Sequence, residues 1–179
     1  MPEYQNLNCD NITLIGMPGA GKSTLGVVLA KKLGYRFVDT DLLLQEGSGM
    51  LLSQLIEQRG VDGFVAAENE LLAGLQCEHH IIATGGSAVY SEQGMENLKA
   101  LGLVLFIDIG IDELHRRLHQ DLLDRGVVVR QGSTIEDLYQ ERLPLYRGYA
   151  DITVKTDGLS TRKAVETIIE ALRADGAIA

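Results

Sequence analysis

The sequence has few cysteines, few prolines and no long hydrophobic run, and each shortage narrows what the protein can be. Its two cysteines, Cys9 and Cys77, are too few and too far apart for a disulfide scaffold or a CxxC site. The three prolines and 23% charged residues are typical of a globular chain rather than a disordered one. Every apolar stretch is far shorter than the roughly 18 residues of a membrane span, so we expect no membrane contact.

Basic residues are also in short supply. Lys and Arg number 16 against 25 for Asp and Glu, which gives a formal net charge of −9. This balance argues against nucleic acid or an anionic membrane surface as the main partner. The residues after Met1 are polar and lack the basic and apolar regions of a secretory signal. We therefore expect a cytoplasmic protein that binds neither nucleic acid nor membrane.

Short apolar segments alternate with amphipathic ones along the 179 residues, a length typical of one domain. The segments that read as short buried strands are 12–15, 36–38, 80–83, 103–107 and 152–154. Helices are expected between them, for example at 23–33 and 161–172, where apolar residues fall on one face. The alternation predicts an α/β fold: a three-layer doubly wound sandwich around a mostly parallel five-stranded sheet.

A phosphate-binding motif follows the first expected strand. Residues 16–24, GMPGAGKST, match the GxxxxGK[ST] pattern in full and open into a helix. In this pattern, backbone N–H groups and the helix N-terminus face the phosphates, Lys22 reaches the β- and γ-phosphates, and the Ser23 hydroxyl is placed to bind Mg²⁺. The residues expected to bind the nucleotide are Gly16, Gly19, Ala20, Gly21, Lys22, Ser23 and Thr24.

A triphosphate site of this kind occurs in small-molecule kinases, GTPases and ATPase motors. The chain lacks the Asn-Lys-x-Asp motif expected of a GTPase of this size, and a motor usually needs a longer chain. A kinase needs an acceptor pocket and a closing lid. Two segments outside the strand–helix rhythm can supply them, so we expect one kinase domain over 1–179 with an acceptor-binding helical insert at about 41–76, broken near Gly60, and a lid loop at about 119–134.

Two carboxylates follow the second expected strand, at the sheet edge where ligands of open α/β folds bind. Asp39 would hold Mg²⁺ through water, and Asp41 would orient the acceptor hydroxyl for in-line attack. The alternative for this pair is a strand end followed by a helix N-cap. Asp108 ends a later apolar strand, as a Walker B acid does, but we assign it no metal because Asp39 already offers a carboxylate.

In order and spacing, these motifs resemble those of shikimate kinases, in the nucleoside-monophosphate-kinase-like group. The resemblance covers about residues 12–172 and rests on GMPGAGKST, FVDTD, a helical insert with Phe64 and Glu68, ATGG, an Arg-bearing loop, and ERLPLYR at 141–147. It implies transfer of the ATP γ-phosphoryl group, with Mg²⁺, to a hydroxyl of a small carboxylated polyol. Shikimate is the best-named acceptor, which implies a role in aromatic amino acid biosynthesis.

The resemblance also implies roles for single residues. On the acceptor side, Asp41 contacts the hydroxyls, Gly85 and Gly86 supply backbone contacts, and Arg142 grips the carboxylate. On the nucleotide side, the lid residue Arg125 meets the transferring phosphate, and Arg117 stacks on adenine. The residues expected to be catalytic are Lys22, Asp41 and Arg125.

Three departures from the family pattern affect the acceptor site and the lid. The usual GExxFR reads GVDGFV at 60–65, so Val65 replaces an arginine that binds the acceptor carboxylate. The third glycine of the usual GGG turn is Ser87. This adds a hydroxyl at a position where, in the family, the backbone contacts the ligand. The usual Arg-Pro-Leu-Leu of the lid reads RGVV at 125–128. The nucleotide side is therefore complete, and the acceptor side is altered.

Two alternatives follow from these departures. One is a kinase for a different polyol or hydroxy acid that needs only one carboxylate-binding arginine, Arg142. The other is a nucleotide-binding regulatory protein whose acceptor site has decayed. Asp41, Arg125 and Arg142 argue against a regulator, since a nucleotide sensor has no use for them. For the kinase we expect ATP and a small hydroxyl-bearing acceptor as partners, and a monomer.

Overall fold

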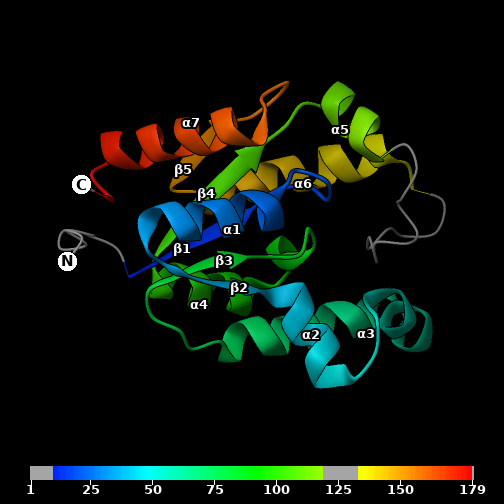
Figure 1. Ribbon diagram of the computed structural model, residues 1–179. Coiled ribbons are helices and arrows are strands. Elements are labelled where there is room, and N and C mark those ends of the chain that lie inside the picture. Colours follow the sequence, from blue (N-terminus) through cyan, green and yellow to red (C-terminus); the bar gives the residue numbers. More distant parts are fainter. Residues whose placement is uncertain (1–9, 119–132, 179) are drawn as a thin grey trace.

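The computed structural model describes residues 10–118 and 133–178. One sheet lies at its centre (Figure 1), with strand order β2-β3-β1-β4-β5 and every neighbouring pair parallel. The strands are β1 (Asn11–Ile15), β2 (Arg36–Asp39), β3 (His80–Ala83), β4 (Leu103–Asp108) and β5 (Ile152–Lys155). The predicted α/β fold with a five-stranded sheet is confirmed, and the described sheet is wholly parallel.

Helices cover both faces of this sheet. They are α1 (Lys22–Leu33), α2 (Thr40–Ser48), α3 (Leu52–Gly74), α4 (Glu92–Leu101), α5 (Ile111–Leu118), α6 (Ile135–Tyr149) and α7 (Thr161–Ala174), with a short 3₁₀ turn, η1 (Ala88–Tyr90). Right-handed crossovers put α1 and α7, which pack on each other, on one face, and α3, α4 and α6 on the other. Over residues 10–118 and 133–178, no helix combines the length and apolar character of a membrane span.

The segment between β2 and β3 forms the expected pair of helical stretches, with a break inside α3. Gly60 has φ +70° and ψ 176°, a conformation that interrupts the helix and that glycine adopts without a steric penalty. Around this break, Leu44, Leu52, Leu55 and Phe64 form a small buried cluster separate from the main core. The α2–α3 unit therefore has its own apolar support beside the sheet.

The parallel arrangement brings three loops to the same edge of the sheet. The phosphate-binding loop follows β1, Asp39 ends β2, and the segment 84–87 follows β3. Because β1 lies between β3 and β4, the chain reverses its direction across the sheet at this point, where open α/β sheets bind their ligands.

A buried asparagine joins elements at the opposite edge of the sheet. The Asn11 side chain is 1% exposed; its Nδ2 donates to the carbonyls of Cys77 (3.0 Å) and Leu101 (2.9 Å), and its Oδ1 accepts from the His80 amide (2.9 Å). We predict that Asn11→Ala lowers the free energy of unfolding by about 2–4 kcal/mol, because it leaves buried backbone groups unpaired. Urea denaturation measures this, and a loss below about 0.5 kcal/mol would contradict it.

Candidate active site

A cavity of about 280 Å³ opens at the carboxyl edge of the sheet. It is lined by Pro18, Gly19, Gly21, Lys22, Ser23, Thr24, Asp41, Phe64, Thr84, Gly85, Gly86, Ser87 and Arg142. The lining comes from the phosphate-binding loop, the starts of α1 and α2, the helix α3, the turn after β3 and the helix α6. The structure thus brings the predicted acceptor-binding residues and most of the predicted phosphate-binding loop to one cavity, while Gly16, Ala20 and Arg117 do not line it.

The phosphate-binding loop has a shape that only glycine fits at two points. Gly16 has φ +149°, and a Cβ there would lie 2.6 Å from the Ile107 carbonyl oxygen. Gly21 caps the N-terminus of α1 with φ +93°. The glycines therefore keep the loop close to β4 and turn it directly into the helix, whose free N–H groups suit a phosphate.

Lys22 lies almost fully inside this loop, with 6% of its surface exposed. Its Nζ donates to the carbonyls of Gly16 (2.7 Å) and Met17 (2.9 Å). Burial lowers the pKa of Lys22 to about 8, while the nearby Asp41 carboxylate acts in the opposite direction. A poorly hydrated cation at this position is poised to interact strongly with phosphate oxygens, since the local dielectric is low.

Ser23 and Asp39 lie side by side at the mouth of the loop. The Ser23 hydroxyl donates to Oδ2 of Asp39 (2.6 Å), and Oδ1 of Asp39 accepts from the Asp41 amide (3.0 Å), which caps α2. Of the alternative interpretation of this pair as a strand end and a helix N-cap, both parts fall on Asp39, which ends β2 and caps α2. Its carboxylate still lies beside the serine hydroxyl. Neighbouring hydroxyl and carboxylate oxygens are the donor set that suits Mg²⁺.

Asp41 and the glycine turn after β3 approach each other closely. A Cβ on Gly85 would lie 2.7 Å from Oδ1 of Asp41 and 2.6 Å from Oε1 of Glu68. Burial, and secondarily the Asp39 carboxylate, raise the pKa of Asp41 to about 6 against the effect of Lys22. The glycine pair, a weak signal in the sequence, thus has a steric reason: it lets two carboxyl groups reach the turn.

This geometry gives a direct prediction for Gly85→Ala. The added methyl group would displace the carboxyl ends of Asp41 and Glu68 rather than backbone, so the fold should survive while the acceptor side is disturbed. We expect kcat/KM for the acceptor to fall about tenfold, since a misplaced group loses favourable orientation. Steady-state kinetics measure this; an unchanged kcat/KM with an unchanged thermal midpoint would contradict it.

Arg142 forms the inner wall of the cavity and is 0% exposed. Its Nε donates to the Tyr90 hydroxyl (3.0 Å), and its guanidinium carbon lies 5.0 Å from the centre of the Tyr90 ring. On the next turn of α6, the Tyr146 hydroxyl donates to the Gly86 carbonyl (2.6 Å). The helix α6 therefore holds the glycine turn and places a permanent cation beside it.

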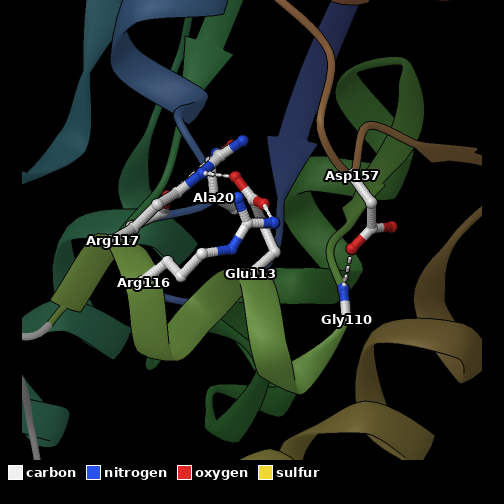
Figure 2. Close-up of polar contacts among 7 residues, drawn as sticks. Ala20, Gly110, Glu113, Arg116, Arg117 and Asp157 are labelled. Carbon is white, nitrogen blue, oxygen red and sulfur yellow. Dashed lines mark hydrogen bonds and ion pairs between the residues drawn. The ribbon is translucent and has the colours of Figure 1, made fainter.

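Arg117 does not line the main cavity but contacts the phosphate-binding loop from α5. Figure 2 shows it reaching past Glu113, whose Oε1 accepts from Arg117 Nε (2.7 Å), toward Ala20. Its Nη1 donates to the carbonyls of Gly19 (3.2 Å) and Ala20 (3.3 Å). Arg117 also lines a neighbouring cavity of about 210 Å³ between this loop and the start of α7, with Leu159 among the other residues. Stacking on adenine stays a prediction for this residue.

Apart from its place in the family resemblance, no sequence signal assigns a role to Glu68, which is 0% exposed behind Gly85. The Ser87 hydroxyl, expected to face the acceptor, donates instead to Oε2 of Glu68 (2.6 Å). Burial raises the pKa of Glu68 to about 7, although the Ser87 hydrogen bond lowers it. The sequence signal that could have indicated Glu68 was an acidic residue four positions after Phe64 on the same helix. No spacing rule links Glu68 to Ser87, because Ser87 lies on another element.

The remaining expected site residues lie elsewhere. Val65 lines a second cavity of about 330 Å³, which shares Arg142 with the first, while the preceding Phe64 lines the main one. Asp108 is not among the residues that line the main cavity. Arg125 and most of the expected lid loop lie outside the described residues.

Comparisons with known proteins agree over nearly the whole chain. A family model for shikimate kinase matches residues 18–173. A shikimate kinase of Methylococcus capsulatus is 36% identical over 172 residues, covering 94% of this chain and 96% of the relative. A shikimate kinase from Acinetobacter baumannii, solved with shikimate, has a TM-score of 0.82 at 27% identity, covering 97% of this chain and 98% of its own. The Aquifex aeolicus shikimate kinase has a TM-score of 0.78 at 31% identity, covering 92% and 97%.

Proposed function

The chain belongs to the shikimate kinase family, and on that premise we propose that it transfers the γ-phosphoryl group of ATP to a hydroxyl of shikimate. The family makes it an ATP-dependent phosphotransferase that acts on a hydroxyl group. The main support for the proposed acceptor is that the buried Lys22 lines the same cavity as Asp41 and Arg142. A cation for phosphate, a carboxylate for a hydroxyl and a cation for a carboxylate suit a carboxylated polyol.

On the nucleotide side, the loop amides would hold the phosphates and Lys22 would offset the negative charge that grows during transfer. The adjacent oxygens of Ser23 and Asp39 fit Mg²⁺, with Ser23 as a direct ligand and Asp39 through water. The ion, when bound, would neutralise phosphate charge. Arg117, in contact with the loop carbonyls, would border the base.

On the acceptor side, Asp41 would accept a hydrogen bond from the attacking hydroxyl and orient it toward the γ-phosphorus. Arg142 would bind the acceptor carboxylate, and the backbone of Gly85 and Gly86 would lie against the ring. Tyr90 and Tyr146 support this arrangement, because they hold the Arg142 side chain and the Gly86 carbonyl in place.

We further propose that the α2–α3 unit acts as the acceptor-binding insert and that the loop at about 119–134 acts as the lid, with Arg125 meeting the transferring phosphate. A protein built this way needs no second copy to complete its site, so we expect a monomer in solution. Light scattering at assay concentration measures the mass, and a stable dimer would contradict this expectation.

An acceptor panel tests the proposed function. ADP release is measured with Mg²⁺-ATP and shikimate, and then with other polyols and hydroxy acids at equal concentration. Shikimate should give the highest kcat/KM. A different preferred acceptor would overturn the proposed substrate, and ATP binding without transfer to any hydroxyl would favour a regulatory role.

One observation favours a related kinase with another acceptor. Val65 puts an apolar side chain on the cavity that it shares with Arg142, where the family pattern expects a second arginine. An acceptor with a less polar edge beside its carboxylate would suit this wall better than shikimate. The acceptor panel separates the two candidates.

The same feature predicts the effect of Val65→Arg. A second cation beside Arg142 should lower the KM for shikimate about tenfold with little change in the KM for ATP, since charge-assisted hydrogen bonds to carboxylate are strong. Ala66→Arg, which adds the same charge at an exposed position of α3, is the matched control and should leave both KM values unchanged. An unchanged shikimate KM in Val65→Arg would mean that Arg142 alone suffices.

A further inference from the structure

Glu68 is a buried carboxyl group with a hydrogen bond at only one of its two oxygens among the described residues. The residue is 0% exposed, and its Oε2 accepts from the Ser87 hydroxyl (2.6 Å). Its Oε1 has no hydrogen-bond partner among the described residues, and it points at the Gly85 turn that lines the cavity. A buried carboxylate oxygen without a donor is costly, whereas a carboxylic acid tolerates the site far better.

The charged and titratable groups around Glu68 come from three other elements. Asp41 on α2 adds a negative charge, Lys22 at the start of α1 and Arg142 on α6 add positive charges, and Tyr146 on α6 faces the same interior. The two cations favour an ionised Glu68, while burial and Asp41 oppose it. The ionised and protonated forms of Glu68 are therefore close in free energy, and a new charge in the cavity can shift the equilibrium between them.

An anionic acceptor brings such a charge. Its carboxylate would bind Arg142, the cation that helps to stabilise ionised Glu68, and it would add a negative charge close to this buried carboxyl group. Both changes disfavour the ionised form of Glu68. Admitting one carboxylate is then easiest if Glu68 becomes neutral.

We propose that Glu68 takes up one proton from solvent when the anionic acceptor binds at Arg142, so that the site neutralises its own carboxyl to admit another. This inference rests on the proposed function, because it requires an acceptor with a carboxylate. Glu68 is a positioning residue here and touches the acceptor only through the Gly85–Ser87 turn. Its role is to set the charge of the pocket.

Linkage between acceptor binding and protonation determines the direction of proton transfer and the pH range in which it occurs. Burial raises the pKa of free-site Glu68 to about 7, and a bound anion raises it further. Well below pH 7 the group already holds its proton, so binding takes up none. Above pH 7, uptake should rise toward one proton, and acceptor affinity should fall by up to about tenfold per pH unit until the pKa of the complex is passed.

Calorimetry of shikimate binding in buffers with different ionisation enthalpies counts these protons directly and needs no turnover. At pH 7.5 we expect uptake of a substantial fraction of one proton by the unaltered protein. Glu68→Gln, which keeps the shape and an acceptor for Ser87, should bind shikimate with clearly lower uptake and a flatter pH dependence. The uptake that remains comes from Lys22 and Asp41, because a new anion also raises their pKa values, which are about 8 and about 6. Glu70→Gln is the matched control, because Glu70 is exposed on the same helix, and its uptake should equal that of the unaltered protein.

Ser87→Ala provides a second, independent variant. Removing the hydroxyl takes away the hydrogen bond that favours ionised Glu68, so the uptake maximum should move to higher pH. Binding without proton uptake, or uptake in Glu68→Gln equal to that of the unaltered protein, would overturn this inference and leave the proposed kinase function standing. Absence of shikimate binding would instead overturn the proposed acceptor, and this inference with it.

Discussion

Lys22→Ala is expected to lower kcat by about 10²–10³-fold, with a much smaller change in ATP affinity. The loop amides would still hold the phosphates in this variant. What is lost is a buried cation: Lys22 is 6% exposed, and burial lowers its pKa to about 8. Its charge therefore interacts most strongly with the additional negative charge of the transition state. ADP-release kinetics give kcat, and calorimetry with Mg²⁺-ATP gives the affinity.

Lys31→Ala is the matched control for this prediction. Lys31 lies on the same helix, α1, and is exposed, so its removal should leave both quantities unchanged. Lys22→Ala should lower the thermal midpoint by a few degrees, because two loop carbonyls lose their buried hydrogen-bond donor, so kcat is measured well below that midpoint. A kcat within about tenfold of the original would remove Lys22 from the catalytic set.

Asp41→Asn should lower kcat by about 10²–10⁴-fold, the range that general-base and orienting groups contribute. The amide keeps the size of the side chain but is a poor proton acceptor. Asp41 lines the cavity, and a Cβ on Gly85 would lie 2.7 Å from its Oδ1, so the carboxyl group lies directly beside the Gly85 turn. Acceptor binding should weaken less than turnover, since Arg142 would still bind the carboxylate.

The control here is Glu46→Gln, which removes an exposed carboxylate from the same helix, α2, and should not change kcat. Single-turnover measurements separate the chemical step from product release. If Asp41→Asn raised only the acceptor KM, Asp41 would bind the acceptor without taking part in proton transfer.

The layered fold was predictable because its signals are local. Buried parallel strands are short apolar runs, so β1, β3 and β4 stand out in the sequence, and the structure differs mainly by a residue at an end. The direction of the sheet follows from the strand–helix alternation. The break in α3 occurs at Gly60, as expected from the backbone freedom of glycine.

The site was predictable only in part. Parallel strands bring their carboxyl ends to one edge, which explains why the loop after β1, Asp39 and the turn after β3 converge as expected. Arg142 is different, because nothing in its spacing indicated a cavity, and its assignment came from a family resemblance. Its burial depends on contacts with Tyr90 and the glycine turn, which are about 50 residues away along the chain.

Taken alone, the sequence determined the class of fold, the triphosphate-binding loop and its lysine, since each depends on neighbouring residues and on backbone geometry. Only the tertiary structure decided that Ser87 turns its hydroxyl to Glu68 and that Val65 lies on a second cavity beside Arg142. Those facts depend on how α3, α6 and the turn after β3 pack together. Side-chain partners across separate elements are set by the packing of the whole domain, and no local pattern encodes them.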